Sequence, residues 1–123
     1  MTVYIDDMYR IPLGKLGRMK MSHMIADTRD ELFAVVDAIG VARKHLQKAG
    51  KPGEHFDVSL AMRDHAIRLG AVPIKMNQLA SMVHRRAETG ALGSPDDACE
   101  WFTALLKRER EERLAALDNE EGL

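Results

Sequence analysis

The chain lacks the sequence features that would assign it at once to a disulfide-rich, nucleic-acid-binding or membrane class of protein. One cysteine, Cys99, excludes an internal disulfide and a multi-cysteine zinc site. The 18 basic and 19 acidic residues give a net charge of -1, so no overall field indicates nucleic acid or a cationic partner. No apolar run approaches the roughly 18 to 20 residues of a membrane span, and residues 1–7 lack a basic and then apolar leader. We therefore expect a cytoplasmic protein without a membrane segment.

The residues that are present have the balance of a folded domain. Apolar residues make up 46% and charged residues 30% of the 123 positions, which is typical of a globular chain of one domain. Short β-branched or alternating runs predict several strands, and residues 49–53 predict a loop between two of them. The predicted strands are 2–6, 22–26, 43–47 (favoured over a helical extension), 55–58 and 71–74.

Helix signals separate these strands. Thr28 and Glu31 form a capping box for a helix that ends at Gly40, and Ser59 caps a second helix that ends at Gly70, with Arg63 on its polar face. A third helix spans about 76–89, and a fourth begins at Ser94-Pro95 and carries a mixed block of charges at 107–113. The fold class is α/β: a small three- to four-stranded mixed sheet packed by helices in residues 1–90, and a long charged, amphipathic C-terminal helix in residues 91–123.

Histidine and aspartate are paired in two of the predicted strands. Because side chains alternate along a strand, His23 and Asp27 share one face, and His55 and Asp57 share another. Neutral imidazole and carboxylate are ligands for zinc, manganese or iron, and histidine also acts as a base near neutral pH. These four residues are the candidate catalytic and metal-binding set, a divalent metal is the possible cofactor, and Asp6 at the end of the first strand is a further candidate ligand.

A structural interpretation of the same residues remains open, and it is the simpler one. Asp27 directly precedes the cap Thr28, and Asp57 lies two residues before the cap Ser59, so both carboxylates can serve a helix N-terminus. In that case each histidine only bonds to its neighbour. No HExxH, CxxC or HxH spacing supports the metal interpretation.

Residues 9–21 predict a basic loop between the first two strands. Two glycines allow backbone amides to approach an anion, so a phosphate-bearing ligand is a hypothesis for this loop, although a solvated crossing is the alternative. Because the loop joins the two strands, we expect it to adjoin the histidine cluster. Its candidate ligand-binding side chains are those of Arg10, Lys15, Arg18 and Lys20.

The C-terminal helix and the third helix are candidate surfaces that could bind a partner. Trp101 and Phe102 are expected to anchor the last helix to the domain, and a helix of this kind can also form a homodimer or bind a partner protein. The basic run His84-Arg85-Arg86 lacks aromatic side chains for stacking, so nucleic acid is not indicated.

An ordered set of short motifs resembles one known family. The matching segments are 3–6, 22–27, 31–32, 39–40, 55–58 and 70–72. On these segments the chain resembles the domain of unknown function 4031 (DUF4031) family of small bacterial and phage proteins over about residues 2–80, and the resemblance implies no activity. The positions that the family pattern singles out are Asp6, His23, Asp27, Glu31, His55 and Asp57. Phe33 stands where many relatives have a further histidine.

Two functional hypotheses from different classes follow. The first is a small His/Asp site that handles a phosphate-bearing or nucleotide-like ligand, and a metal-assisted hydrolase is one form of this hypothesis. The second is a non-catalytic phage or bacterial accessory protein that binds a host or partner protein through its methionine-rich and helical surfaces. The histidine and acid pairs favour the first hypothesis, and the absence of a recognised catalytic motif favours the second.

Overall fold

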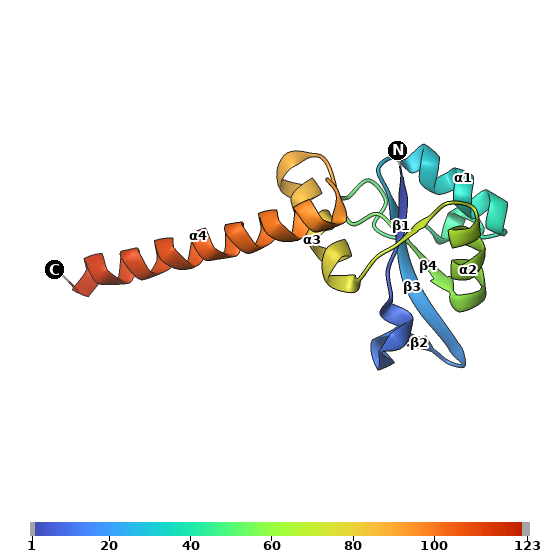
Figure 1. Cartoon of the computed structure of the whole chain (residues 1–123), viewed down its shortest axis with the longest axis horizontal. Helices are drawn as coiled ribbons and strands as arrows, with labels where there is room; N and C mark the ends of the chain where they lie inside the picture. The colour runs from blue at the N-terminus through green and yellow to red at the C-terminus, as the bar shows by residue number, and fades with distance from the viewer. Residues whose placement is uncertain (1, 122–123) are drawn as a thin grey trace.

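Strand β3 (Met19–Ala26) organises the sheet of the computed structural model, which describes residues 2–121. It pairs antiparallel with β1 (Val3–Ile5), β2 (Lys15–Leu16) and β4 (Phe56–Ser59), and β5 (Val72–Pro73) adds to β1 in parallel. The result is a five-stranded mixed sheet with helices packed on it (Figure 1). The predicted α/β class is confirmed.

Alternation along the strands divides the core between the two faces of the sheet. On one face Ile5, Met24 and Phe56 pack under α1 (Arg29–Ile39) and α2 (Leu60–Arg68). On the other face Tyr4 and Ile25 pack against α3 (Met76–Thr89) and the start of α4 (Pro95–Glu121). His23 lies two residues before Ile25, so its side chain is on the face that α3 covers.

The helix boundaries follow the local signals. The Thr28 hydroxyl accepts a hydrogen bond from the backbone N–H of Glu31 at 3.2 Å, and the Ser59 hydroxyl accepts one from that of Met62 at 3.4 Å. Gly40 ends α1 in the left-handed conformation, with φ of 82°. These caps are confirmed because they depend on side chains only a few residues away.

The segment predicted as a loop at 9–21 is more ordered than expected. It contains two 3-10 turns, η1 (Met8–Arg10) and η2 (Pro12–Gly14), and then the β2–β3 hairpin. Gly17, with φ of 61°, is the first of the two turn residues. This hairpin supplies the fifth strand, and two residues of β2 are too short a run to give a periodic signal.

The strand predicted at residues 43–47 is wrong. Residues Arg43–His45 form a 3-10 turn, η3, and Gln47 alone makes a β-bridge with His55. The guanidinium of Arg43 binds the Asp37 carboxylate at 2.7 Å and lies 4.6 Å from the centre of the Phe33 ring. These contacts with α1 hold the segment in a turn where it would otherwise extend.

Helix α4 has an inner part that packs and an outer part that does not. Ala98 is buried in the core, and the ring of Phe102 lies 4.6 Å from that of His84 on α3. Every residue from Leu106 to Asn119 is exposed, and the helix extends far beyond the body (Figure 1). Within residues 2–121 no helix has the length and apolarity needed to cross a bilayer. The domain boundary at residue 90 stays a prediction.

Candidate functional site

A row of polar side chains crosses three adjacent strands on the face covered by α3. Asp6 follows β1 and donates its backbone N–H to the carbonyl of His23 at 3.0 Å, and His23 is in register with Asp57 of β4. Since directly opposed residues share a face, the three side chains lie side by side. The sequence places them 17 and 34 positions apart, and only the sheet register brings them together.

Asp6 fixes the orientation and the tautomer of His23. The Asp6 side chain is 1% exposed, and one of its oxygens accepts the backbone N–H groups of His23 at 2.9 Å and Met8 at 3.2 Å. Its other oxygen lies 2.7 Å from His23 Nδ1. A carboxylate in this setting only accepts hydrogen bonds, so Nδ1 carries the proton and the lone pair of Nε2 points away from Asp6.

A backbone carbonyl does the same for His55. The carbonyl oxygen of Gly53 lies 2.8 Å from His55 Nδ1, and because a carbonyl can only accept, this nitrogen also carries the proton. The Nε2 atom of His55 is 3.4 Å from Asp57 Oδ1, and the Nε2 atom of His23 is 3.9 Å from the same oxygen. The two imidazole rings meet edge to face, with centroids 5.1 Å apart.

Asp57 leaves one oxygen without a hydrogen-bond partner. The Nε2 group of Gln47 donates to Asp57 Oδ2 at 2.6 Å, whereas the buried Oδ1 has no partner among the described residues. Two imidazole lone pairs and one carboxylate oxygen therefore converge, with one ligand atom from each residue within 4.8 Å of the others. Three acceptors at this spacing repel each other unless a cation or a proton lies between them.

The spacing suits a metal ion. Bonds of about 2.0–2.2 Å in tetrahedral geometry separate neighbouring ligand atoms by about 3.4 Å. The distances of 3.4 Å and 3.9 Å to Asp57 Oδ1 are close to that value. His23, His55 and Asp57 are thus the residues that can hold a divalent metal, and Asp6, Gly53 and Gln47 orient them.

The same contacts shift the titration of His23. The hydrogen bond with Asp6 raises the pKa of His23 above its ordinary value of 6.5. The negative charges of Asp6 and Asp57 raise the pKa further, while partial burial and the cation of Lys48 act in the opposite direction. The surroundings of this imidazole therefore favour a positive charge.

A hollow of about 250 Å³ opens beside the two histidines. One wall is the apolar side of α3, with Leu79, Ala80 and Val83, and the other carries Lys48. Among the described residues Lys48 is the one non-glycine with a left-handed backbone, at φ of 52°. A neighbouring hollow shares Lys48 and Val83 and continues to Lys51 and His84, so the cluster lies beside a groove with a cationic rim.

The structure does not bring Asp27 into this cluster. Four residues of strand separate Asp27 from His23 by about 13 Å, so a shared face does not put them in contact. Asp27 follows the end of β3, is exposed, and accepts the backbone N–H of Thr2 at 2.9 Å. It is the one member of the proposed catalytic set that the fold places elsewhere. The Phe33 position is also remote from the cluster, because its ring packs 6.2 Å from that of Phe56 on the other face of the sheet.

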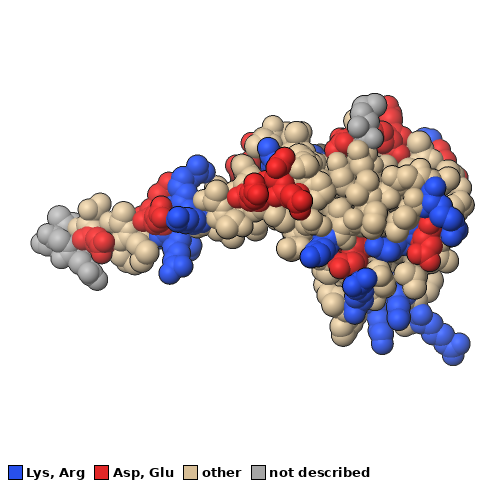
Figure 2. Space-filling model, viewed as in Figure 1, with Lys and Arg blue, Asp and Glu red and all other residues tan. Residues whose placement is uncertain are grey.

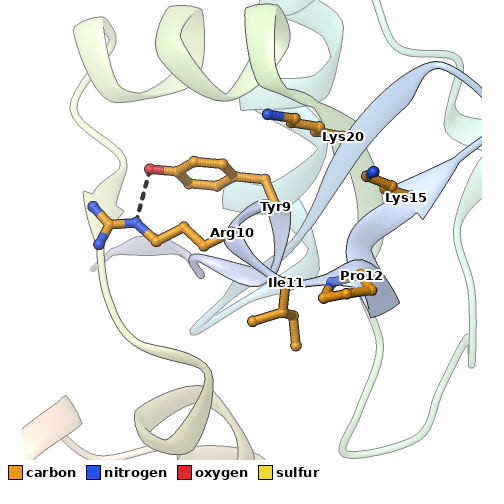
Figure 3. Close-up of a pocket in the computed structure, with 6 residues that line it drawn as sticks. All are labelled: Tyr9, Arg10, Ile11, Pro12, Lys15 and Lys20. Atoms are coloured by element: carbon orange, nitrogen blue, oxygen red, sulfur yellow. Dashed lines mark hydrogen bonds between the residues drawn. The ribbon is translucent and has the colours of Figure 1, made fainter.

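The basic segment forms a separate hollow, and the expectation that it adjoins the histidines is wrong. A space of about 420 Å³ is lined by Arg10, Lys15 and Lys20 together with Tyr9, Ile11 and Pro12, whereas Arg18 does not line it (Figure 3). It shares no lining residue with the histidine hollow. Lys20 and His23 are three residues apart on β3, so alternation sends them to opposite faces.

Sequence reasoning missed several residues around the site. Gln47 gives no sequence signal, since its role depends on the β-bridge between Gln47 and His55. The Gly53 carbonyl gives none because it is a backbone group. Arg63 was expected on a polar surface but is 9% exposed. Its Nε donates to the carbonyl of Asp6 at 3.0 Å and its guanidinium lies 4.7 Å from the centre of the Tyr9 ring. Arg63 thereby supports the backbone that carries Asp6.

The fold and the cluster define a small α/β protein with two histidines and one aspartate converging on a sheet face. Comparison with known families gives a match over residues 3–86 to DUF4031, described as a protein of unknown function. The chain belongs to this family, and the matched range contains Asp6, His23, His55 and Asp57. Neither the curated proteins nor the solved structures contain a significant match.

Proposed function

We propose that His23, His55 and Asp57 bind a divalent metal ion and that the protein is a metal-dependent hydrolase of phosphate-bearing compounds. The observation that carries the proposal is the convergence of two tautomer-fixed Nε2 atoms on the unpartnered Oδ1 of Asp57. With neither a cation nor a proton between them, that arrangement leaves three acceptors facing each other. Two histidines and one carboxylate are a common ligand set for zinc and iron.

Three protein ligands favour a catalytic role over a structural one. Structural zinc sites close the coordination with four protein ligands, whereas catalytic sites keep a position open. A metal in such a site activates water and polarises a phosphoryl oxygen. Asp6 and the Gly53 carbonyl orient the imidazoles of His23 and His55, and Gln47 orients the carboxylate of Asp57.

The cationic rim supports a phosphate-bearing substrate. Lys48 lines the hollow beside His23 and His55, and Lys51 lines its continuation. An ammonium group that lines the same hollow attracts a phosphoryl group and stabilises charge that develops on it. The apolar wall of α3 gives the organic part of the substrate a surface to pack on.

Metal titration of the full chain tests the proposal. We expect stoichiometric binding of Zn²⁺ or Mn²⁺ by calorimetry, and at least about a 100-fold loss of affinity in His55→Ala and in Asp57→Asn, since each removes a ligand rather than an orienting group. His45→Ala is the matched control, because His45 is exposed and outside the cluster. Circular dichroism establishes that each variant is folded.

Hydrolysis of p-nitrophenyl phosphate and of bis-p-nitrophenyl phosphate is then measured with the preferred metal. Lys48→Gln is expected to raise KM while metal affinity stays unchanged. Metal binding that survives both ligand substitutions would contradict the metal site. Metal binding without turnover of either ester would contradict hydrolysis but not the site.

The outer part of α4 supports a second candidate, a non-catalytic protein that binds a partner. Leu106, Leu114 and Leu117 are 48%, 52% and 55% exposed on the part of α4, residues 106–119, in which every side chain is exposed. A partner that recognises this helix would be lost from pull-downs on Leu114→Ser and Leu117→Ser substitution and retained by His55→Ala. The reverse result would favour the hydrolase.

A further inference from the structure

The β2–β3 hairpin and the turns before it form an unbalanced basic segment. From Met8 to Ala26 the chain contains four cations, Arg10, Lys15, Arg18 and Lys20, and no acidic residue. Within residues 2–121, no salt bridge reaches any of these four side chains. Lys15 lies directly opposite Lys20 across the hairpin, a like-charge pair that destabilises it. This arrangement is favourable only where a negative surface meets it.

The same segment exposes large aliphatic side chains. Leu13 is 71% exposed, Leu16 61%, Met19 49% and Ile11 42%. Leu16 is in register with Met19, so these two share one face of the hairpin while Lys15 and Lys20 share the other. Exposed aliphatic residues scattered singly are normal, but four within nine positions form a patch that points to a contact surface.

The hairpin is mounted firmly on the body and projects from it. A Cβ on Gly14 would overlap the Met8 carbonyl and lie 2.9 Å from that of Met21, so η2 packs flush against its neighbours. Tyr9 is fixed between the guanidiniums of Arg63 at 4.7 Å and Arg10 at 5.7 Å. In Figure 2 basic side chains extend from the end of the body where Figure 1 shows β2. The turns before the hairpin are therefore packed on the body, while Leu13 and Leu16 remain exposed.

We propose that this hairpin docks the protein on an anionic lipid bilayer, with Leu13 and Leu16 entering the interface and the cations binding headgroup phosphates. A lipid surface fits better than nucleic acid because a phosphate backbone offers nothing to exposed leucines. In addition, the Tyr9 ring is flanked by guanidinium groups and is not free to stack on a base. A projecting apolar tip with flanking cations matches a bilayer surface, because the tip can enter the acyl-chain region while the cations contact the anionic headgroups. The docking does not involve the metal ligands, because the hollow lined by Arg10, Lys15 and Lys20 shares no residue with the hollow beside His23 and His55.

Co-sedimentation of the full chain with vesicles tests the proposal. The probes are vesicles of phosphatidylcholine with phosphatidylglycerol and vesicles of phosphatidylcholine alone. We expect binding to the anionic vesicles only. Each of Lys15→Gln and Lys20→Gln should weaken binding about fivefold, since a cation near such a surface contributes about 1 kcal/mol. Leu16→Ser should weaken it about tenfold or more through lost apolar burial.

Two matched variants control for general effects. Leu117→Ser removes an equally exposed leucine (55%) far from the hairpin, and Lys44→Gln removes an exposed lysine elsewhere, so the net charge changes as in Lys15→Gln. Both are expected to bind as the unaltered chain does. Equal losses in the control variants would overturn the proposal, because the effect would then be one of overall charge or solubility.

Three further results would overturn it. One is the absence of binding to anionic vesicles. Another is binding that Leu13→Ser and Leu16→Ser leave unchanged, which indicates a polyanion site without insertion. The third is competition by inorganic phosphate or by duplex DNA that displaces the protein completely, which assigns the cations to a free phosphate or to nucleic acid.

Discussion

The outer half of α4 and the polar row on the sheet are both dense in ionisable side chains, yet they are held in opposite ways. On α4 the charged residues at 107–113 lie within one exposed helix, where neighbours four apart have opposite sign (Figure 2). In the polar row His23 is held by Asp6 and Asp57 by Gln47, both from other segments, and His55 is held by the carbonyl of Gly53, two residues before it.

The difference concerns what each region can do. A pair of opposite charges on an exposed helix stabilises it by only about 0.2–0.5 kcal/mol, and each pair can be replaced. In the cluster, buried or half-buried groups fix the tautomer of an imidazole and leave a carboxylate oxygen unpartnered. Chemistry that depends on a lone pair in a defined direction is available only in the second region.

The largest expected contrast between the two regions is in stability. Phe56, on the strand that carries Asp57, is fully buried under α1 and α2, whereas Leu117 on α4 is 55% exposed. Phe56→Ala should lower the free energy of unfolding by about 3–5 kcal/mol because it leaves a cavity, and Leu117→Ala should change it by less than about 0.5 kcal/mol. Urea unfolding measures both. A Leu117→Ala loss comparable to that of Phe56→Ala would show that the outer helix packs on something.

A smaller contrast concerns the groups that orient the metal ligands. An asparagine at position 6 would still accept hydrogen bonds from the backbone N–H groups of Met8 and His23, but its amide nitrogen cannot accept a hydrogen bond from His23 Nδ1. Asp6→Asn should therefore move the His23 proton to Nε2 and lower metal affinity about 10–100-fold. Calorimetry gives the affinity, and ¹⁵N shifts of the imidazole give the tautomer.

The matched control for Asp6→Asn is Glu111→Gln on α4, which removes the same charge where only local pairs depend on it. It should leave metal affinity unchanged. An Asp6→Asn variant that binds metal normally and keeps the proton on Nδ1 would show that Asp6 does not orient His23.

The smallest effect is the pH dependence of the metal-free protein. The pKa of His23 is raised above 6.5 in the folded state, chiefly by its hydrogen bond with Asp6. The stabilisation from its charge is therefore complete below the unfolded value of about 6.5, and it is lost as the pH rises through the folded value. The difference in unfolding free energy between the unaltered chain and His23→Gln, followed by urea titration, should shrink over that interval. A difference that grows with pH would mean that the pKa of His23 is lowered instead.

Much of the secondary structure could be predicted because its causes are local. Thr28, Ser59 and Gly40 act on backbone groups a few residues away, and helix α3 has the predicted bounds of 76–89. The strand expected at residues 43–47 failed for the opposite reason. The contacts of Arg43 with Asp37 and Phe33 lie outside any local pattern.

The residues of the candidate site also divide into those with a local sequence signal and those without one. His23, His55 and Asp57 were identified from residue type and spacing, and Asp6 from its place at the end of a strand. Asp27 was a candidate on the same grounds, yet it lies outside the cluster. Two residues on the same face of a strand can still be far apart along it. Gln47 and Lys48 gave no sequence signal, since the bridge between Gln47 and His55 brings their segment to the cluster. Gly53 gave none because it acts through a backbone carbonyl, which every residue has.

The sequence by itself determined which residue types can carry chemistry, where the helices begin and end, and the family to which the chain belongs. Only the tertiary structure decided which carboxylates meet the histidines, which nitrogen of each ring faces the centre, and which leucines remain outside. The reason is that caps and periodicity act over a few residues. Strand register instead brings His23 into contact with Asp6, 17 residues before it, and with Asp57, 34 residues after it.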